Sequence, residues 1–362
     1  MKVDSRELSD ACSYVGKATS EKTNLSETAM VRIKADVDLT LYATNLEFTA
    51  GIRIANVLAE AEEYFDVAVP YKLLRSILSG REGVLDLKVD EHTNVLKITG
   101  KKEDGRKWSG TLRGIHGERF PSIHKVPVGD GIKLDTDVVG FWKKVSMCID
   151  QKEIGRSAKG SVLLKQSGSK LSLVAANGLQ LACFSKEINT NDNFEVMLSL
   201  NVGDWLRFFE NGKLIIQDDW SHLVAPDRWV SFAQYDFSFP KFESLIAPYL
   251  AIDKRYTVIK DNFLAALSAS KLYSEGMVNV KIEDDVLIIS AFGDNGNFLE
   301  TIVCSSNVPD SEPQIININN GHMYDMLSTA KTELLLLTPF QNGIVIREDN
   351  EEEGYWWGVL YG

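Results

Sequence analysis

Long apolar runs and closely spaced cysteines are both missing from this chain of 362 residues. Apolar runs such as "LLLL" at 334–337 fall far short of the eighteen or so residues that span a membrane. The four cysteines, at positions 12, 148, 183 and 304, lie too far apart for a zinc or redox motif. The opening stretch "MKVDSRELSDAC" has no apolar signal-peptide core. We therefore expect a cytoplasmic protein that does not associate with membranes.

Motifs for catalysis are also scarce. The stretch "GRSAKGS" at 155–161 lacks the Gly-Lys-Ser/Thr ending of a phosphate-binding loop, and the acidic run "EDNEEEG" at 348–354 lacks the glycine-punctuated spacing of a calcium loop. The five histidines, at 92, 116, 124, 222 and 322, do not pair with a nucleophile or a metal ligand at a motif spacing. The sequence thus predicts a protein that is not an enzyme and holds no cofactor or metal. An enzyme whose site assembles only in the fold remains an alternative.

The net charge of −12 argues at first against nucleic acid as a partner, because phosphate binding depends on clustered lysines and arginines. Net charge does not describe distribution, however. An acidic protein can carry a basic lining on one enclosed face.

The chain contains one pattern three times. Similar hairpins are expected at "LTLYATNLEFTAGIRI" (39–54), "LSLVAANGLQLACFSKEI" (171–188) and "VLIISAFGDNGNFLETIVC" (286–304). Amphipathic helices are expected before and after each hairpin, at 5–18 and 69–80, 135–149 and 200–212, and 259–272 and 319–331. Further strands follow the second helix of each third. The order is therefore helix, strands, helix, strands in every third.

This order predicts an α+β fold of three tandem similar domains, with antiparallel sheets on one side and the helices on one common face. The proline-containing stretches "RFPSIHKVPVGDG" (119–131) and "FPKFESLIAPYLAIDK" (239–254) are expected to be linkers. The predicted domains are residues 1–127, 128–252 and 253–362.

The whole chain resembles the bacterial sliding clamp family, the beta subunits of DNA polymerase III. The resemblance rests on an ordered set of segments: "LYATNLEFTAGIRI" with "VAVPYKLLRSILSG", then "LSLVAANGLQLACFSKEI", "RFPSIHKVP", "FSFPKFESLIAP" and the terminal "YWWGVLYG". It implies the DNA clamp fold, with helices lining the inner face of a ring that a head-to-tail homodimer forms. It implies a processivity factor in DNA replication that encircles double-stranded DNA regardless of sequence. DNA polymerase, the clamp loader and a second copy of the chain are the implied partners.

The resemblance also implies a pocket for partner peptides between the second and third domains. Matched by position, the pocket comprises Ala176, Gly178, Leu179, Gln180, Leu181, Pro240, Ser244, Leu245, Trp356, Gly358, Val359, Leu360 and Tyr361. Clamps often carry His-Arg where this chain has Leu179-Gln180, and Met-Pro-Met-Arg/Lys-Leu where it has residues 358–362. A divergent or phage-encoded clamp with its own preferred motif is therefore expected. The alternative for Trp356 and Leu360 is an ordinary place in the core of the last strand.

Two further sets of residues follow from the same matching. Helix residues expected to face DNA are Lys17, Lys72, Arg75, Lys143, Lys144, Arg207, Lys271 and Lys331. The alternative for each is an ordinary solvated helix face. The seam of the ring would join Trp108 of one subunit to Leu272 and Tyr273 of the other, although burial within their own domain is the alternative. An acidic DNA mimic or scaffold protein that does not encircle DNA is the remaining alternative function.

Overall fold

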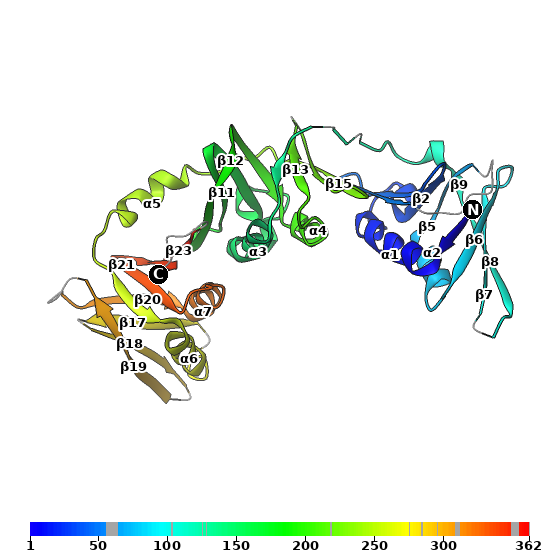
Figure 1. Ribbon diagram of the computed structural model, residues 1–362. Coiled ribbons are helices and arrows are strands. Elements are labelled where there is room, and N and C mark those ends of the chain that lie inside the picture. Colours follow the sequence, from blue (N-terminus) through cyan, green and yellow to red (C-terminus); the bar gives the residue numbers. More distant parts are fainter. Residues whose placement is uncertain are drawn as a thin grey trace. The chain divides into compact units, whose positions relative to one another are not determined.

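The chain folds into two compact units in a computed structural model (Figure 1). The structure describes residues 1–55, 64–102, 104–124, 126–127, 129–217, 219–274, 276–283, 285–294, 296–307, 312–348 and 355–361. Unit 1 comprises Met1–Asp135 and Phe208–Ala233, and unit 2 comprises Thr136–Arg207 and Gln234–Gly362. The middle third of the chain thus contributes to both units. The division into domains at 127 and 252 stays a prediction.

Unit 1 holds two helices and two antiparallel sheets. Its helices are α1 (Ser5–Val15) and α2 (Tyr71–Leu78). A four-stranded sheet has the order β1 (Lys2–Asp4), β6 (Val84–Asp90), β7 (Val95–Lys101) and β8 (Lys107–Arg113). A nine-stranded sheet has the order β10 (Ile132–Lys133), β13 (Lys213–Ile216), β14 (Trp220–Val224), β15 (Arg228–Ala233), β4 (Phe48–Ile54), β3 (Leu39–Thr44), β2 (Met30–Ala35), β5 (Phe65–Pro70) and β9 (Ile115–His116).

The nine-stranded sheet joins strands from the first and middle thirds of the sequence. The junction is the antiparallel pairing of β15 with β4, from Arg228 opposite Ile52 to Phe232 opposite Phe48. Because these are backbone ladders, the two thirds form one continuous sheet and one core in unit 1.

Helix α1 covers one face of this sheet. Its residues Leu8, Cys12 and Val15 recur at spacings of four and three and are all buried, as the sequence predicted. The helix begins after Asp4, whose side chain accepts from the backbone N–H of Arg6 at 2.8 Å. It packs against α2 and against β3 and β4, so the apolar stripe faces the sheet.

Unit 2 contains the remaining elements. Its helices are α3 (Thr136–Val145), the short α4 (Gly203–Leu206), α5 (Phe242–Leu250), α6 (Lys260–Ser270) and α7 (Asn320–Ser328). Its ten strands have the order β11 (Ser161–Ala176), β12 (Gln180–Ser199), β23 (Tyr355–Tyr361), β22 (Gly343–Glu348), β21 (Leu334–Phe340), β16 (Tyr256–Ile259), β19 (Gly296–Ser306), β18 (Val286–Gly293), β17 (Met277–Glu283) and β20 (Gln314–Asn319).

The same arrangement recurs in unit 2. Strand β23 pairs with β12, as β15 pairs with β4, and again joins two thirds of the sequence in one sheet. Helix α3 packs on β11 and β12, and α6 and α7 pack side by side, as do α1 and α2 (Figure 1). The three predicted hairpins and five of the six predicted helices are present close to their expected bounds.

The turns of the first two hairpins share one construction. The side chain of Asn45 accepts from the N–H of Glu47 and Phe48, and the side chain of Asn177 accepts from the N–H of Leu179 and Gln180. The residue after each asparagine has a positive φ, 76° at Leu46 and 95° at Gly178. Residues 45–48 and 177–180 are therefore equivalent positions of a structural repeat.

Four sequence expectations need correction. Helix α4 is a single turn, whereas a helix over 200–212 was expected. The apolar face expected for the helix at 69–80 included Leu73, which is 55% exposed because only Leu74 and Leu78 face the core, with Ile77 partly buried. The stretch expected to be a linker at 239–254 contains helix α5. The sequence predicts two strands after the second helix of the middle third, at 213–219 and 229–236, and strand β14 between them was not anticipated.

Candidate functional site

The hairpin and the terminal strand that were expected to share the partner pocket are neighbours in unit 2. The register of β12 and β23 places Gln180 opposite Leu360, Leu181 opposite Val359 and Ala182 opposite Gly358. Residues separated by about half the chain are thus brought together. The sequence alone does not show that β12 pairs with β23, because similar residue patterns do not identify which strands are neighbours.

The two faces of this strand pair have different surroundings. Leu181 and Val359 belong to a buried apolar cluster with Phe239 and Phe242 of the junction segment, residues 239–254. Gly358 faces the opposite way, since a Cβ atom at this residue would lie 2.3 Å from the sulfur of Met326 in α7. By the alternation of strand residues, Leu360, which is 1% exposed, shares that helix-covered face. Leu360 is thus buried in the single chain, and its part in a partner pocket stays a prediction.

The hairpin tip offers the more accessible side chains. Leu179 is 58% exposed, whereas the amide of Gln180 is buried and donates to the carbonyl of Met147 at 3.1 Å. Ala176 is partly buried against the apolar cluster, and Gly178 forms the turn. A peptide that reached this surface would therefore meet Leu179 first.

The junction segment lies against the same cluster. The rings of Phe239 and Phe242 meet edge to face at 6.3 Å, and both are buried. Lys165 of β11 forms an ion pair of 2.6 Å with Glu243, and its ammonium lies 5.6 Å from the Phe242 ring. Pro240 and Ser244 are exposed beside this contact. The side chains of Leu245, Trp356 and Tyr361 lie outside the described residues.

Several of the predicted DNA-facing cations are exposed. In unit 1 these are Lys17, which lies 5.9 Å from the Phe208 ring, Lys72, which forms a 2.6 Å ion pair with Glu21, and Arg75. In unit 2, Lys143 and Arg207 are exposed, and Lys271 lies 4.0 Å from the Tyr324 ring. Contact with DNA stays a prediction for each of them.

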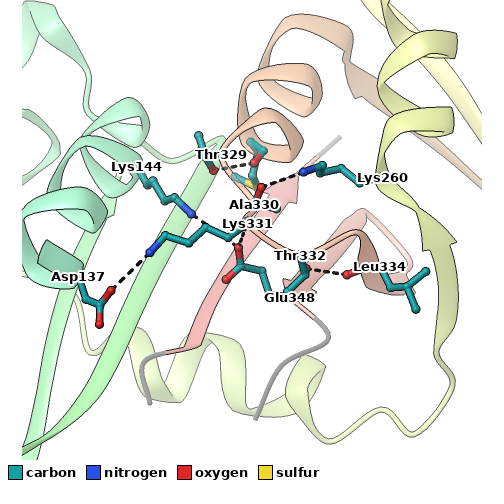
Figure 2. A network of polar contacts seen from close by, with 10 residues as sticks. Asp137, Lys144, Lys260, Thr329, Ala330, Lys331, Thr332, Leu334 and Glu348 are labelled. Atoms are coloured by element: carbon teal, nitrogen blue, oxygen red, sulfur yellow. Dashed lines mark hydrogen bonds and ion pairs between the residues drawn. The ribbon is translucent and has the colours of Figure 1, made fainter. Parts of the chain in front are cut away.

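Lys144, which is mostly buried, and Lys331, whose side chain is 59% exposed, take part in a polar network (Figure 2). The Lys144 ammonium lies 3.6 Å from the carboxylate of Glu348, and their side chains are only 12% and 5% exposed. The backbone N–H of Lys331 donates to the same carboxylate, and the Lys331 ammonium forms a 3.4 Å ion pair with Asp137 of α3. The network therefore ties α3 to the turn after α7 and to the end of β22.

Burial dominates the electrostatics of this network. Burial lowers the pKa of the Lys144 ammonium below its usual value, while the charge of Glu348 opposes that change. The Lys144 ammonium has no hydrogen-bond partner among the described residues. Contact with DNA stays a prediction for Lys144 and Lys331 as well.

The residues predicted to form the seam lie near free strand edges. Trp108 belongs to β8, which pairs only with β7 in the described part of its sheet. The guanidinium of Arg81 covers its ring at 4.3 Å. Leu272 follows α6 and is 75% exposed, and the Tyr273 ring lies 5.7 Å from that of Phe298. Their proposed meeting across two subunits stays a prediction.

Chemically reactive groups are sparse in the described part of the chain. All four cysteines are buried, and burial raises the pKa of each thiol, for Cys12 to about 12. Among the described residues, no group of histidines, cysteines or carboxylates has the geometry of a metal site. No described helix is long and apolar enough to cross a membrane.

Comparison with known proteins identifies solved structures that share this architecture. No family model and no curated protein matches the chain. Among solved structures, the chain is similar to the DNA polymerase III subunit beta of Pseudomonas aeruginosa, with a TM-score of 0.85, 17% identity, and coverage of 100% of this chain and 99% of that one. The sliding clamp of Bacillus subtilis gives a TM-score of 0.87 at 16% identity, with 99% and 97% covered. The beta clamp of Helicobacter pylori bound to a DNA ligase peptide gives 0.83 at 15% identity, with 100% and 99% covered. The chain therefore has the DNA clamp fold of the DNA polymerase III beta subunits along its whole length.

Proposed function

We propose that this protein is a DNA sliding clamp, a processivity factor that encircles double-stranded DNA as a ring and tethers a DNA polymerase. The likeness in fold to sliding clamps over the full length of the chain is the observation that supports this most directly. We further propose that the protein is not an enzyme and that its ring is a head-to-tail homodimer. The clamp loader and peptides of other DNA-processing proteins complete the set of proposed partners.

The repeated architecture supports a ring by simple geometry. Twelve helices about 10 Å in diameter, set side by side around a circle, leave an opening of about 28 Å. Double-stranded DNA is roughly 20 Å wide and would pass through such an opening with water around it. A dimer supplies this number if each chain contributes α1 with α2, α3 with the single turn α4, and α6 with α7.

The acidic charge is compatible with this function if DNA is held by topology. An encircling ring needs few phosphate contacts, because release requires the ring to open or a DNA end to be reached. The exposed Lys17, Arg75 and Lys143 would then keep the duplex centred, with an affinity that falls steeply as salt rises.

The partner surface is proposed at the hairpin tip and junction segment of unit 2. The Helicobacter pylori neighbour was solved with a DNA ligase peptide, which supports peptide binding by proteins of this fold. In this chain, the exposed residues Leu179, Pro240 and Ser244 lie around the buried cluster that contains Leu181 and Val359.

Retention on circular DNA tests the proposed function. The protein is loaded by its host's clamp loader onto a nicked circular plasmid and then washed with salt that abolishes binding to linear DNA. We expect it to remain on the circle and to leave when a restriction enzyme linearises the plasmid. Equal loss from circles and linear DNA at the same salt would favour the acidic DNA-mimic alternative.

A further inference from the structure

A cavity lies in unit 1, which does not include the hairpin tip and junction segment proposed as the partner surface. It has a volume of about 810 Å³ and is formed on one face of the nine-stranded sheet. One row of residues crosses five adjacent strands on that face: Lys213, Val224, Trp229, Gly51 and Tyr42. This volume lies within the range of binding sites for small ligands and peptide side chains.

The structural repeat identifies the side chains of unit 2 that occupy the position equivalent to this cavity. Counted from the equivalent turn residues Asn45 and Asn177, Gly51 corresponds to Cys183. Cys183 is in the buried cluster that Phe239 and Phe242 of the junction segment complete. In unit 2, therefore, two aromatic side chains of the chain itself cover this part of the sheet.

Unit 1 lacks such a cover in its described residues. The corresponding junction segment contributes Val126 and Pro127 to the lining of the cavity, and its His124 stacks on Trp220 at 3.6 Å. Gly51 leaves room for the Trp229 ring, because a Cβ atom there would lie 2.2 Å from that ring. The Trp229 and Tyr42 rings meet at 5.7 Å and form an aromatic wall.

The charges around the cavity indicate which kind of ligand fits it. Its charged lining residues are Arg53 and Lys213, both cations, in a protein with a net charge of −12. Arg53 lies 3.7 Å from Asp38 and donates to the carbonyl of Pro226 at 3.2 Å, Lys213 lies 3.9 Å from Asp130, and each side chain is 52% exposed. Two half-exposed cations beside aromatic rings favour a ligand with an apolar group and one carboxylate over a polyanion.

The junction segment of unit 2 provides a template for that guest. There, Phe239 and Phe242 occupy the cluster while the adjacent Glu243 forms its 2.6 Å ion pair with Lys165. We infer that the unit 1 cavity binds a short peptide of another protein, with an aromatic anchor between Tyr42, Trp229 and Pro127 and an adjacent carboxylate at Arg53 or Lys213. This would be a second peptide site, independent of whether the protein encircles DNA.

The experiment uses the full chain labelled with 5-fluorotryptophan, with the Trp229 signal assigned from a Trp229→Phe variant. The probe is the blocked hexapeptide Phe-Pro-Lys-Phe-Glu-Ser, which has the sequence of residues 239–244. We expect a saturable shift of the Trp229 fluorine resonance. A peptide with lysine in place of its glutamate should bind about tenfold more weakly, the ratio expected for a lost ion pair and a new repulsion.

Variants of the chain test whether the peptide binds at this cavity. The double variant Arg53→Glu and Lys213→Glu should weaken the glutamate-containing peptide about tenfold or more. The same two charge reversals at Lys88 and Lys97, exposed residues of the four-stranded sheet that do not line the cavity, should have no effect. Thr40→Trp, which fills the cavity without changing charge, should also block binding, so the test does not depend on one variant folding well.

Three results would overturn the inference. The first is an unchanged Trp229 resonance at saturating peptide, with shifts confined to other tryptophans. The second is equal binding of the glutamate-containing peptide and of the peptide with lysine in its place. The third is a response of Trp229 to a thymidine octanucleotide but not to the peptide, which would assign the cavity to single-stranded nucleic acid.

Discussion

Leu46 and Gly178 occupy the same position in two equivalent hairpin turns, and both have a positive φ, of 76° and 95°. Glycine adopts this conformation without strain, whereas a leucine side chain is crowded by its own backbone. The first repeat thus carries strain at a position where the second does not. The Leu46 side chain is 54% exposed, so it has little packing to lose.

Leu46→Gly should therefore stabilise unit 1. We expect the free energy of unfolding to rise by about 0.5–1 kcal/mol, because relief of strain exceeds the entropy that glycine adds to the unfolded chain. Urea unfolding followed by circular dichroism measures this change. The control is Leu25→Gly, at a residue with φ of −105°, which should be neutral or destabilising. A destabilised Leu46→Gly protein would mean that the turn is not strained.

The buried pair of Lys144 and Glu348 predicts a strong asymmetry between single and double substitutions. Glu348→Gln leaves the Lys144 ammonium buried without a carboxylate and should cost about 3–5 kcal/mol of unit 2 stability. The double variant Lys144→Met and Glu348→Leu should recover most of this loss, since it removes both charges. As a control, Glu243→Gln breaks a more exposed pair with Lys165 and should cost under about 1 kcal/mol. Additive effects in the double variant would contradict a buried, coupled pair.

The buried histidine of β14 predicts a loss of stability in acid. Burial lowers the pKa of His222 to about 4, with the charge of the nearby His124 acting in the same direction, and its ring contacts Ser231 at 2.8 Å and Gln217 at 3.1 Å. Because the folded state resists protonation, the contribution of His222 is complete above its unfolded pKa near 6.5. It should fall by about 1.4 kcal/mol per pH unit as the pH drops from there towards 4.

The measurement is urea unfolding between pH 7.5 and 4.5 for the wild type and His222→Gln. The difference in free energy of unfolding between the two proteins should narrow as the pH falls, because only the wild type has a buried ring that becomes charged. A difference that stays constant with pH would show that His222 titrates normally.

The proposed dimer seam predicts a folded monomer from one substitution. Leu272 is 75% exposed in the single chain, so Leu272→Asp should leave the fold intact while placing an unpaired charge in the interface. Sedimentation velocity should give the mass of one chain in place of two. Val37→Asp, at a residue that is 80% exposed in the turn between β2 and β3, is the matched control and should remain dimeric. A dimeric Leu272→Asp protein would move the seam elsewhere.

The proposed partner surface predicts a specific role for Leu179. Leu179→Glu should weaken binding of a peptide from the C-terminal tail of the host polymerase about tenfold or more, as expected for loss of one apolar anchor. Leu25→Glu, at another exposed leucine, should bind as the wild type does. Fluorescence anisotropy with a labelled peptide measures both. Equal affinities would separate the hairpin tip from the partner surface.

Local patterns in the sequence were sufficient for most of the fold. The spacing of Leu8, Cys12 and Val15 identifies α1, and alternation identifies strands such as β6 and β7, because burial of one face requires these periods. The single turn of α4 and the helix α5 were not recognisable. A proline at position 248 argues against a helix, yet α5 forms because Phe242 packs into the unit 2 cluster.

The sites were harder to foresee than the elements. Lys144 reads as an exposed helix cation, and only the fold shows that Glu348, from a distant strand, lies beside its ammonium and accepts from the backbone N–H of Lys331. Leu360 read as part of a pocket, and the pairing of β23 with β12 shows that it faces α7. Such contacts join residues far apart in sequence and leave no local signal.

The ladder between β4 and β15 has a consequence for how the chain can be divided. Five backbone-paired positions, and the hydrogen bond of 2.9 Å from the Tyr14 phenol to the carbonyl of Trp229, join the first third of the sequence to the middle third. Cleavage of the peptide chain between Phe120 and Ile132 would therefore leave the two pieces associated. The protein would tolerate a nick there, and two separately translated fragments would assemble without a covalent linker.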